Sequence, residues 1–271
     1  MWQMVATTGG IIMVKQLQNA VRLVSLVTLL SMLLGVAPVH AEDERDAAFP
    51  KLSTSMSQHM PDDPVYWMLL FDEFEWQNQR EGNVLSWDVN AWIGTDMHRA
   101  LLRAEGERND GNTTENRLEL LWVRPVAAYW DLVAGLRMDS EPGPTRNYVG
   151  IGVQGLAPQW VYVEATAWVG DRGQTAATLK LEYEMLLTNR LILTPAIETD
   201  IYGKDDTANG IGNGFSVMKA GLRLRYEIRR EFAPYVGVEW AGKFGDTADL
   251  ARSEDEAVRD ARVVAGLRFW F

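Results

Sequence analysis

From residue 65 onward, apolar and polar residues alternate almost one by one. In "QWVYVEATAWVG", Val161 and Val163 fall on one face of an extended chain, and Glu164 and Thr166 fall on the other. A period of two is that of a β-strand whose faces meet different surroundings. The alternating segments reach about ten residues, the length that crosses an outer membrane at a tilt, whereas soluble sandwich strands are shorter. The pattern predicts an all-β, antiparallel transmembrane barrel over residues 65–271.

Twelve such segments can be counted, and an even number places both ends of the barrel on the periplasmic side. The expected strands are 65–78, 84–95, 99–108, 115–124, 128–139, 147–156, 159–171, 174–186, 190–201, 215–229, 233–244 and 261–271. Short turns are expected at "APQ", "DRG" and "TN", and long polar loops at "NDGNTT", "SEPGPTR", "YGKDDTANGIGNG" and "GDTADLARSEDEAVRD". Short turns on one rim and long loops on the other are typical of outer-membrane barrels.

The last segment, "RVVAGLRFWF", carries an apolar stripe that ends on an aromatic residue. Its members are Val263, Ala265, Leu267, Phe269 and Phe271. This stripe resembles the terminal signal that the outer-membrane assembly machinery recognises. The alternative is the closing strand of a soluble barrel or sandwich.

Residues 1–41 have the order of a secretory signal peptide. Lys15 and Arg22 come first, the apolar run "LVSLVTLLSMLLGVA" follows, and "VHA" ends on Ala41. We expect cleavage after Ala41, with residues 1–12 as an upstream start. Losing two positive and no negative charges takes the formal charge from −11 to −13. Such an acidic exported chain disfavours nucleic acid as a partner and is compatible with attracting cations.

The faces opposite the apolar stripes are charged and are predicted to line the lumen. The predicted inward acids are Glu73, Glu75, Asp88, Glu105, Glu107, Glu119, Asp131, Glu164, Glu182, Glu184, Glu198, Asp200, Glu227 and Glu239. The predicted inward bases are Arg103, Arg117, Arg137, Lys180, Arg223, Arg225, Arg262 and Arg268. Because isolated charges in a dry interior are costly, one interpretation is an ion-paired network that braces the barrel. The other is a cation path, because acids outnumber bases.

Ahead of the barrel, residues 42–64 lack periodicity and are expected to form a flexible periplasmic segment. This segment contains "MSQHM", with Met56, His59 and Met60, in a chain that has no cysteine. Thioether sulfur and imidazole suit Cu(I), so the triplet is a candidate soft-metal site, although short flexible segments also contain such residues by chance. The "MHR" at residues 97–99 is a weaker candidate.

Catalytic chemistry has little support in this sequence. Pairs such as Glu105 with Glu107 share a strand face and could act as acid and base, but similar pairs recur along many strands as wall residues would. A nucleophile motif is missing from the sequence, and "GIGNG" is not placed to begin a helix. We therefore predict a protein that is not an enzyme.

Several stretches together resemble the copper resistance protein B family of outer-membrane proteins. The resemblance runs in order over about residues 59–271 and includes "LSWDVNAWIG", "LILTPAIETDIYGKDD", "GLRLRYEIRREFAPYVGVEW", "KFGDTADLAR" and "VVAGLRFWF". It implies an outer-membrane, copper-binding barrel that works with periplasmic partners, notably a multicopper oxidase. Family members carry a longer Met- and His-rich stretch ahead of the barrel, and "MSQHM" stands in its place here.

The predicted function is to bind copper ions or pass them across the cell outer membrane, in contact with outer-membrane lipid. The oxidation state of the copper and the direction of movement stay open. The residues predicted to contact copper are Met56, His59, Met60, Glu73, Glu75, Glu105, Glu107 and Glu164. The alternative is a general porin or structural barrel whose lumen is filled by ion pairs, without metal specificity.

Overall fold

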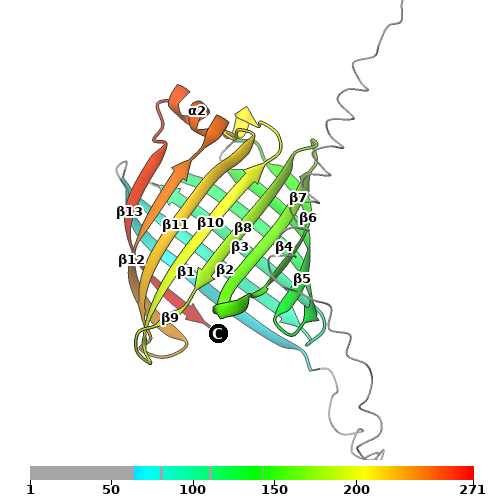
Figure 1. The fold of residues 1–271 in the computed structure, drawn as a ribbon, viewed down its shortest axis with the longest axis vertical. Coiled ribbons are helices and arrows are strands. Elements are labelled where there is room, and N and C mark those ends of the chain that lie inside the picture. The colour runs from blue at the N-terminus through cyan, green and yellow to red at the C-terminus, as the bar shows by residue number, and fades with distance from the viewer. Residues whose placement is uncertain (1–63, 80–81, 110–111, 142) are drawn as a thin grey trace, which may run out of the picture. The chain divides into compact units, whose positions relative to one another are not determined.

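The structure, a computed structural model, describes residues 64–79, 82–109, 112–141 and 143–271. Most of these residues lie in one antiparallel sheet (Figure 1). The strands are β1 (Tyr66–Gln79), β2 (Gly82–Gly94), β3 (Arg99–Asn109), β4 (Asn112–Ala127), β5 (Trp130–Glu141), β6 (Arg146–Leu156), β7 (Val161–Gly170), β8 (Thr175–Tyr183), β9 (Met185–Leu186), β10 (Leu191–Tyr202), β11 (Gly214–Tyr226), β12 (Phe232–Lys243) and β13 (Arg259–Trp270).

The sheet closes on itself because the last strand pairs with the first. Leu70 of β1 lies opposite Trp270 of β13, and Trp76 lies opposite Ala265. The short β9 continues β8 after a break at Glu184, and both pair with β10. Counted this way, the described part of the chain forms a closed barrel of twelve strands, which confirms the fold predicted from the alternation. Closure leaves no strand edge that would need a partner in lipid.

The two rims of the barrel differ in their connections. We call the rim with Tyr66 and Trp270 the terminal rim, and the opposite one the loop rim (Figure 1). The loop rim carries residues 203–213, with the 3-10 helix η3 (Thr207–Asn209), and residues 244–258, with α2 (Gly245–Ser253). The terminal rim carries short turns, one of which contains η2 (Pro158–Trp160). None of the helices in the described ranges is long and apolar enough to cross a membrane.

Three connections differ from the expected division into short and long. The "DRG" turn is short but lies on the loop rim, between β7 and β8. The expected loop "NDGNTT" is largely taken up by strands and "SEPGPTR" only in part, because hairpin pairing continues to Asn109 opposite Asn112 and to Asp139 opposite Arg146. Polar composition alone therefore does not mark where these strands end.

The outer face of the barrel is a continuous apolar band. Large side chains that are at least two-fifths exposed on this face include Leu102, Leu120, Leu136, Val149, Ile151, Val169, Ile197, Leu222, Val236, Val238 and Val263. Exposed aromatic residues gather at the terminal rim, namely Tyr66, Trp67, Tyr129, Trp160, Tyr226 and Phe271. An apolar band flanked by aromatic side chains is what a barrel presents to lipid acyl chains and headgroups. Contact with lipid instead of water explains why so many large apolar side chains can lie on the outer surface.

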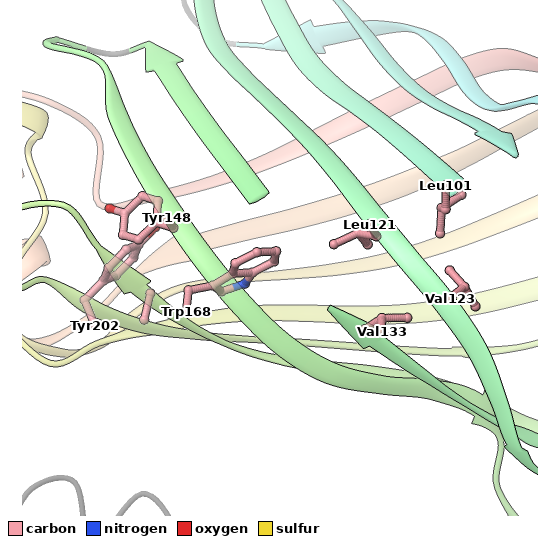
Figure 2. Close-up of a cluster of buried hydrophobic side chains, with 8 residues drawn as sticks. Leu101, Leu121, Val123, Val133, Tyr148, Trp168 and Tyr202 are labelled. Carbon is pink, nitrogen blue, oxygen red and sulfur yellow. The ribbon is translucent and has the colours of Figure 1, made fainter. Parts of the chain in front are cut away.

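The inner face carries one apolar cluster, formed by neighbouring strands from β3 to β10. Figure 2 shows Tyr148, Trp168 and Tyr202 at one end of this cluster and Leu101 and Leu121 toward the other. Trp168 is almost fully buried, and its indole ring lies over the backbone opposite it on β6, where residue 150 is a glycine. A Cβ at that position would meet the ring at 2.2 Å, so glycine is required by this close approach.

A bulge in β1 departs from strict alternation. The pairing of β1 with β2 shifts register between Phe71 and Glu73. As a result Asp72 and Glu73, which are adjacent in sequence, both reach lumenal partners: Asp72 lies 2.6 Å from Arg268, and Glu73 lies 2.9 Å from Arg223. The extra residue of a bulge redirects a side chain to the other face in this way.

Candidate functional site in the lumen

Three strands contribute to an ion cluster around Arg223 in the lumen. Arg223 of β11 donates to Glu75 of β1 at 2.5 Å, to Glu73 at 2.9 Å and to Glu239 of β12 at 2.9 Å. Glu75 is completely buried, and its other oxygen accepts a bond from Gln77 at 3.2 Å. One guanidinium thus compensates several carboxylates, and fixed charge-assisted bonds of this kind offset their loss of hydration.

A second cluster surrounds Arg117 of β4. Its guanidinium donates to Asp200 of β10 at 2.9 Å. Asp139, Glu198 and Glu105 lie farther away, at 3.7, 3.5 and 3.7 Å. Glu198 and Glu105 are also the more exposed carboxylates of this group, with 29% and 28% of their side-chain surface accessible. Arg117 therefore holds these two acids only loosely.

Two ion pairs run directly across the barrel. Lys180 of β8 donates to Asp88 of β2 at 2.9 Å, and Lys219 of β11 donates to Glu115 of β4 at 3.1 Å. In the ring of twelve described strands, β2 and β8 are six positions apart, as are β4 and β11, so each pair joins opposite walls. Asn90 donates to the other oxygen of Asp88 at 2.9 Å, which fixes this carboxylate in the lumen.

Two cavities lie along the lumen on either side of the Lys180–Asp88 pair. The cavity toward the terminal rim has a volume of about 350 Å³ and is lined by residues such as Met68, Trp92 and Glu182. The cavity toward the loop rim is smaller, about 70 Å³, with Glu107 and Glu198 in its wall. Both cavities are lined by Asp88, Glu105 and Lys180. The pair therefore stands at the boundary between them.

Carboxylates predominate in both cavity walls. In the larger cavity the described acids are Asp72, Asp88, Glu105, Glu164, Glu182 and Glu184, and the described bases are Arg99, Arg103, Lys180 and Arg268. In the smaller one they are Glu73, Asp88, Glu105, Glu107, Glu115, Glu198 and Glu239 against Lys180, Lys219 and Arg223. A wall with more carboxylates than bases favours cations over anions.

The five glutamates predicted as copper contacts all face the lumen but do not form one group. Glu73 and Glu75 meet at Arg223. Glu164 bonds Arg103 at 2.9 Å, and Glu107 bonds Arg262 at 3.1 Å. Among the described residues, the nearest base to Glu105 is Arg117, at 3.7 Å. Their inward placement agrees with the alternation, and their role toward copper stays a prediction.

The other metal candidates have different outcomes. Met56, His59 and Met60 lie outside the described residues. Met97 and His98 lie in the turn between β2 and β3, where His98 accepts a hydrogen bond from the indole of Trp122 at 3.2 Å. In the part of the chain that the structure describes, no three His, Asp or Glu side chains are grouped so that they could hold a metal ion.

Several lumenal acids, among them Asp72, Glu115 and Asp139, were missing from the sequence prediction. Asp72 was placed outside by alternation, and the bulge in β1 brings it inside. A lone aspartate in an apolar row, between Leu70 and Phe74, was the signal that could have indicated this bulge. Glu115 was at the edge of an expected loop, although it shares its parity with Arg117 and so belongs to the same face.

The closed barrel, its lipid-facing apolar band and its charged lumen define an integral β-barrel protein of the outer membrane. The solved NanC porin has a similar fold: the two share 8% identity with a TM-score of 0.50, over 73% of this chain and 98% of that one. At this identity the likeness shows the fold alone.

Sequence comparison identifies the family. The model for the copper resistance protein B precursor (CopB) matches residues 65–271. A copper resistance protein B homolog of Pseudomonas syringae pv. tomato is 48% identical over 227 residues, which cover 83% of this chain and 77% of the relative. Copper resistance protein B of Escherichia coli is 43% identical over 234 residues, covering 86% and 78%. The chain belongs to the copper resistance protein B family, which supports a role in copper resistance.

Proposed function

We propose that this barrel binds copper ions in its lumen and passes them across the outer membrane, without acting as an enzyme. The observation that carries this proposal is the excess of carboxylates in the two lumenal cavities. Glu105 and Glu198 are the acids most available to a passing cation, because their nearest base among the described residues, Arg117, is at least 3.5 Å away. Membership of a copper resistance family makes copper the expected cation.

The segment before the barrel adds a second part to this proposal. Residues 1–41 would be removed as a signal peptide, and residues 42–64 would then lead into the periplasmic end of the barrel. Met56, His59 and Met60 would offer thioether and imidazole ligands to copper there. A periplasmic multicopper oxidase is the proposed partner for copper held at this end.

Copper flux into liposomes tests the proposal. We expect liposomes with the purified mature protein to take up copper faster than protein-free liposomes, with little chloride flux. The variant Glu105→Gln should lower copper uptake, whereas Asp249→Asn, on the exposed surface of α2, should not. Equal copper uptake with and without the barrel would contradict passage through the lumen.

The N-terminal segment is tested separately by deleting residues 42–64. We expect this deletion to lower the number of copper ions bound per protein and the copper tolerance of cells, while flux through the barrel persists. Unchanged copper stoichiometry together with unchanged tolerance would remove Met56, His59 and Met60 from the mechanism.

One observation favours a second candidate, a structural barrel without metal specificity. The pairs Lys180–Asp88 and Lys219–Glu115 join opposite walls and obstruct the lumen. A structural barrel would give neither copper uptake nor a cation preference in the liposome assay, and Glu105→Gln would change nothing.

A further inference from the structure

The cross-lumen pair of Lys180 and Asp88 lies between two rows of carboxylates. On the β2 side, Asp88 is directly opposite Glu73 of β1 and Glu105 of β3 in the strand register. On the β8 side, Lys180 is directly opposite Glu164 of β7 and Glu198 of β10. Residues directly opposite each other on neighbouring strands share a face and lie within side-chain reach. The ammonium of Lys180 is thus flanked by acids on its own wall while it bonds an acid on the other.

From this arrangement we infer that the Lys180–Asp88 pair is a gate that closes the lumen to cations. The inference rests on the proposed passage of cations through the lumen. The pair stands where the two cavities meet, and it places one ammonium between opposite walls at that boundary. When the ammonium turns back to its own wall, the cavities join and Asp88 faces the path with Glu73 and Glu105.

The neighbours of Lys180 provide a place for the released ammonium. Glu164 is already engaged by Arg103 at 2.9 Å and by the hydroxyl of Tyr162 at 2.9 Å. Glu198 has a nearest base 3.5 Å away, Arg117, which makes its shorter bond to Asp200. Glu198 is therefore the better acceptor for Lys180 in the open state.

An exchange of ions explains why the gate favours cations. A cation that reaches Asp88 from either cavity replaces the ammonium as counter-ion, so the charge of Asp88 stays compensated while the lysine moves to Glu198. An anion offers Asp88 no such compensation and meets carboxylates on both walls. The same pair thereby determines both closure and selectivity.

Planar-bilayer conductance in potassium chloride tests the gate on the whole mature protein. Lys180→Met removes the ammonium and keeps most of the side-chain length. We expect a several-fold rise in conductance and a reversal potential close to that of potassium in a salt gradient. Lys180→Arg keeps a cation that reaches Asp88 and should conduct like the unmodified protein. Lys243→Met, which removes a lysine from a pair with Glu256 at the loop rim, is the matched control and should leave conductance unchanged.

A variant on the opposite wall shows whether a change in conductance comes from the broken pair or from misfolding. Asp88→Asn breaks the same pair from β2, and it too should raise conductance, with a smaller cation preference because one lumenal carboxylate is lost. Heat-modifiable mobility on gels verifies that each variant is a folded barrel. Folded Lys180→Met and Asp88→Asn variants with unmodified conductance and reversal potential would overturn the gate.

The gate and the copper proposal fail in different ways. Potassium chloride contains no copper, so a conductance raised by Lys180→Met supports the gate whatever the copper assay gives. A raised potassium conductance without copper uptake would reject the copper proposal alone. Copper uptake by the unmodified protein, together with unmodified potassium conductance in both folded gate variants, would reject the gate alone.

Discussion

The apolar cluster and the lumenal ion pairs share the inner face of the barrel, but their side chains reach different distances across the lumen. Trp168 and its apolar neighbours contact residues on adjacent strands from β3 to β10 and fill that side of the lumen. Some of the charged side chains join strands that are far apart, as in Lys180–Asp88 and Lys219–Glu115. Long side chains with charged ends can bond over a gap that branched apolar side chains cannot span.

The apolar cluster and the ion pairs therefore stabilise the barrel by different physical effects. Apolar packing gains free energy from surface removed from water and depends on close fit. Buried ion pairs add little net stability when intact, but removing one partner leaves the other charge without compensation. The lumenal ion pairs should therefore be more sensitive to single substitutions than their net contribution to folding implies.

The largest expected effect is from Arg223→Met. The guanidinium is 11% exposed and bonds Glu73, Glu75 and Glu239, so its loss leaves three acids facing one another. We expect unfolding in urea from lipid vesicles to become easier by about 3–5 kcal/mol. Adding Glu75→Gln should recover part of this loss, because it removes one of the repelling charges. A loss below about 1 kcal/mol would mean that water replaces the guanidinium in the lumen.

The substitution Trp168→Ala tests the apolar side of the comparison. The indole is buried in the cluster, and the guanidinium of Arg137 lies 5.7 Å from its ring centre. We expect the free energy of unfolding to fall by about 3 kcal/mol, from lost burial and the cavity left behind. The control is Trp160→Ala at the terminal rim, 65% exposed, where a change of less than about 1 kcal/mol is expected. Equal losses at both positions would show that the cluster is not packed more tightly than the rim.

An ion pair at the loop rim, between the first residue of β6 and an aspartate outside the strands, sharpens the comparison through its pH dependence. Arg146 donates two bonds to Asp206 in the 203–213 connection, at 2.6 and 2.7 Å, and these bonds lower the pKa of Asp206 below its usual value. A lowered pKa means that the pair stabilises the loop above the unfolded pKa of aspartate and loses this effect as the pH falls through the folded pKa.

We therefore expect Asp206→Asn to weaken the loop by about 2 kcal/mol at neutral pH and by much less in acid. Hydrogen exchange of the backbone N–H groups of residues 203–213 measures this effect. The same substitution should leave exchange in the barrel strands unchanged. An effect of equal size at neutral and acid pH would show that the charge of Asp206 is not what holds the loop.

The smallest effect is expected for the surface pair of Arg252 and Asp249 on α2. Their side chains are 60% and 74% exposed, so water screens the pair. Arg252→Ala should change the free energy of unfolding by less than about 0.5 kcal/mol. Urea unfolding of Arg252→Ala and Arg223→Met under the same conditions measures this change and compares the two losses. A loss comparable with that of Arg223→Met would show that burial is not what distinguishes the lumenal pairs.

Most of the barrel could be predicted from the sequence because the period-two alternation is a direct consequence of lipid outside and charge inside. The first strand was expected at 65–78 and spans Tyr66–Gln79, and the break at Glu184 falls inside a segment expected as 174–186. The inward placement of Glu164 and Glu182 follows from the same alternation.

The partners of each charge could not be predicted in this way. Alternation tells which face a side chain occupies, but bonds across the lumen depend on strand tilt and on the register of strands that are not neighbours. Asp88 and Lys180 are 92 residues apart in sequence, and nothing near either residue indicates the other. The bulge that turns Asp72 inward is a further local irregularity that shifts a side chain against the pattern.

The seam between β1 and β13 also has a consequence for how the barrel is made. All the other strand pairs join segments that follow one another in the chain, so each can form as a local hairpin. The seam joins Leu69 to Phe271, whose backbone groups exchange hydrogen bonds of 3.2 and 2.9 Å at opposite ends of the described chain. Loop closure over such a distance is slow. The kinetic barrier to barrel formation should therefore be concentrated at this one joint, and the ion pair of Asp72 with Arg268 would close last.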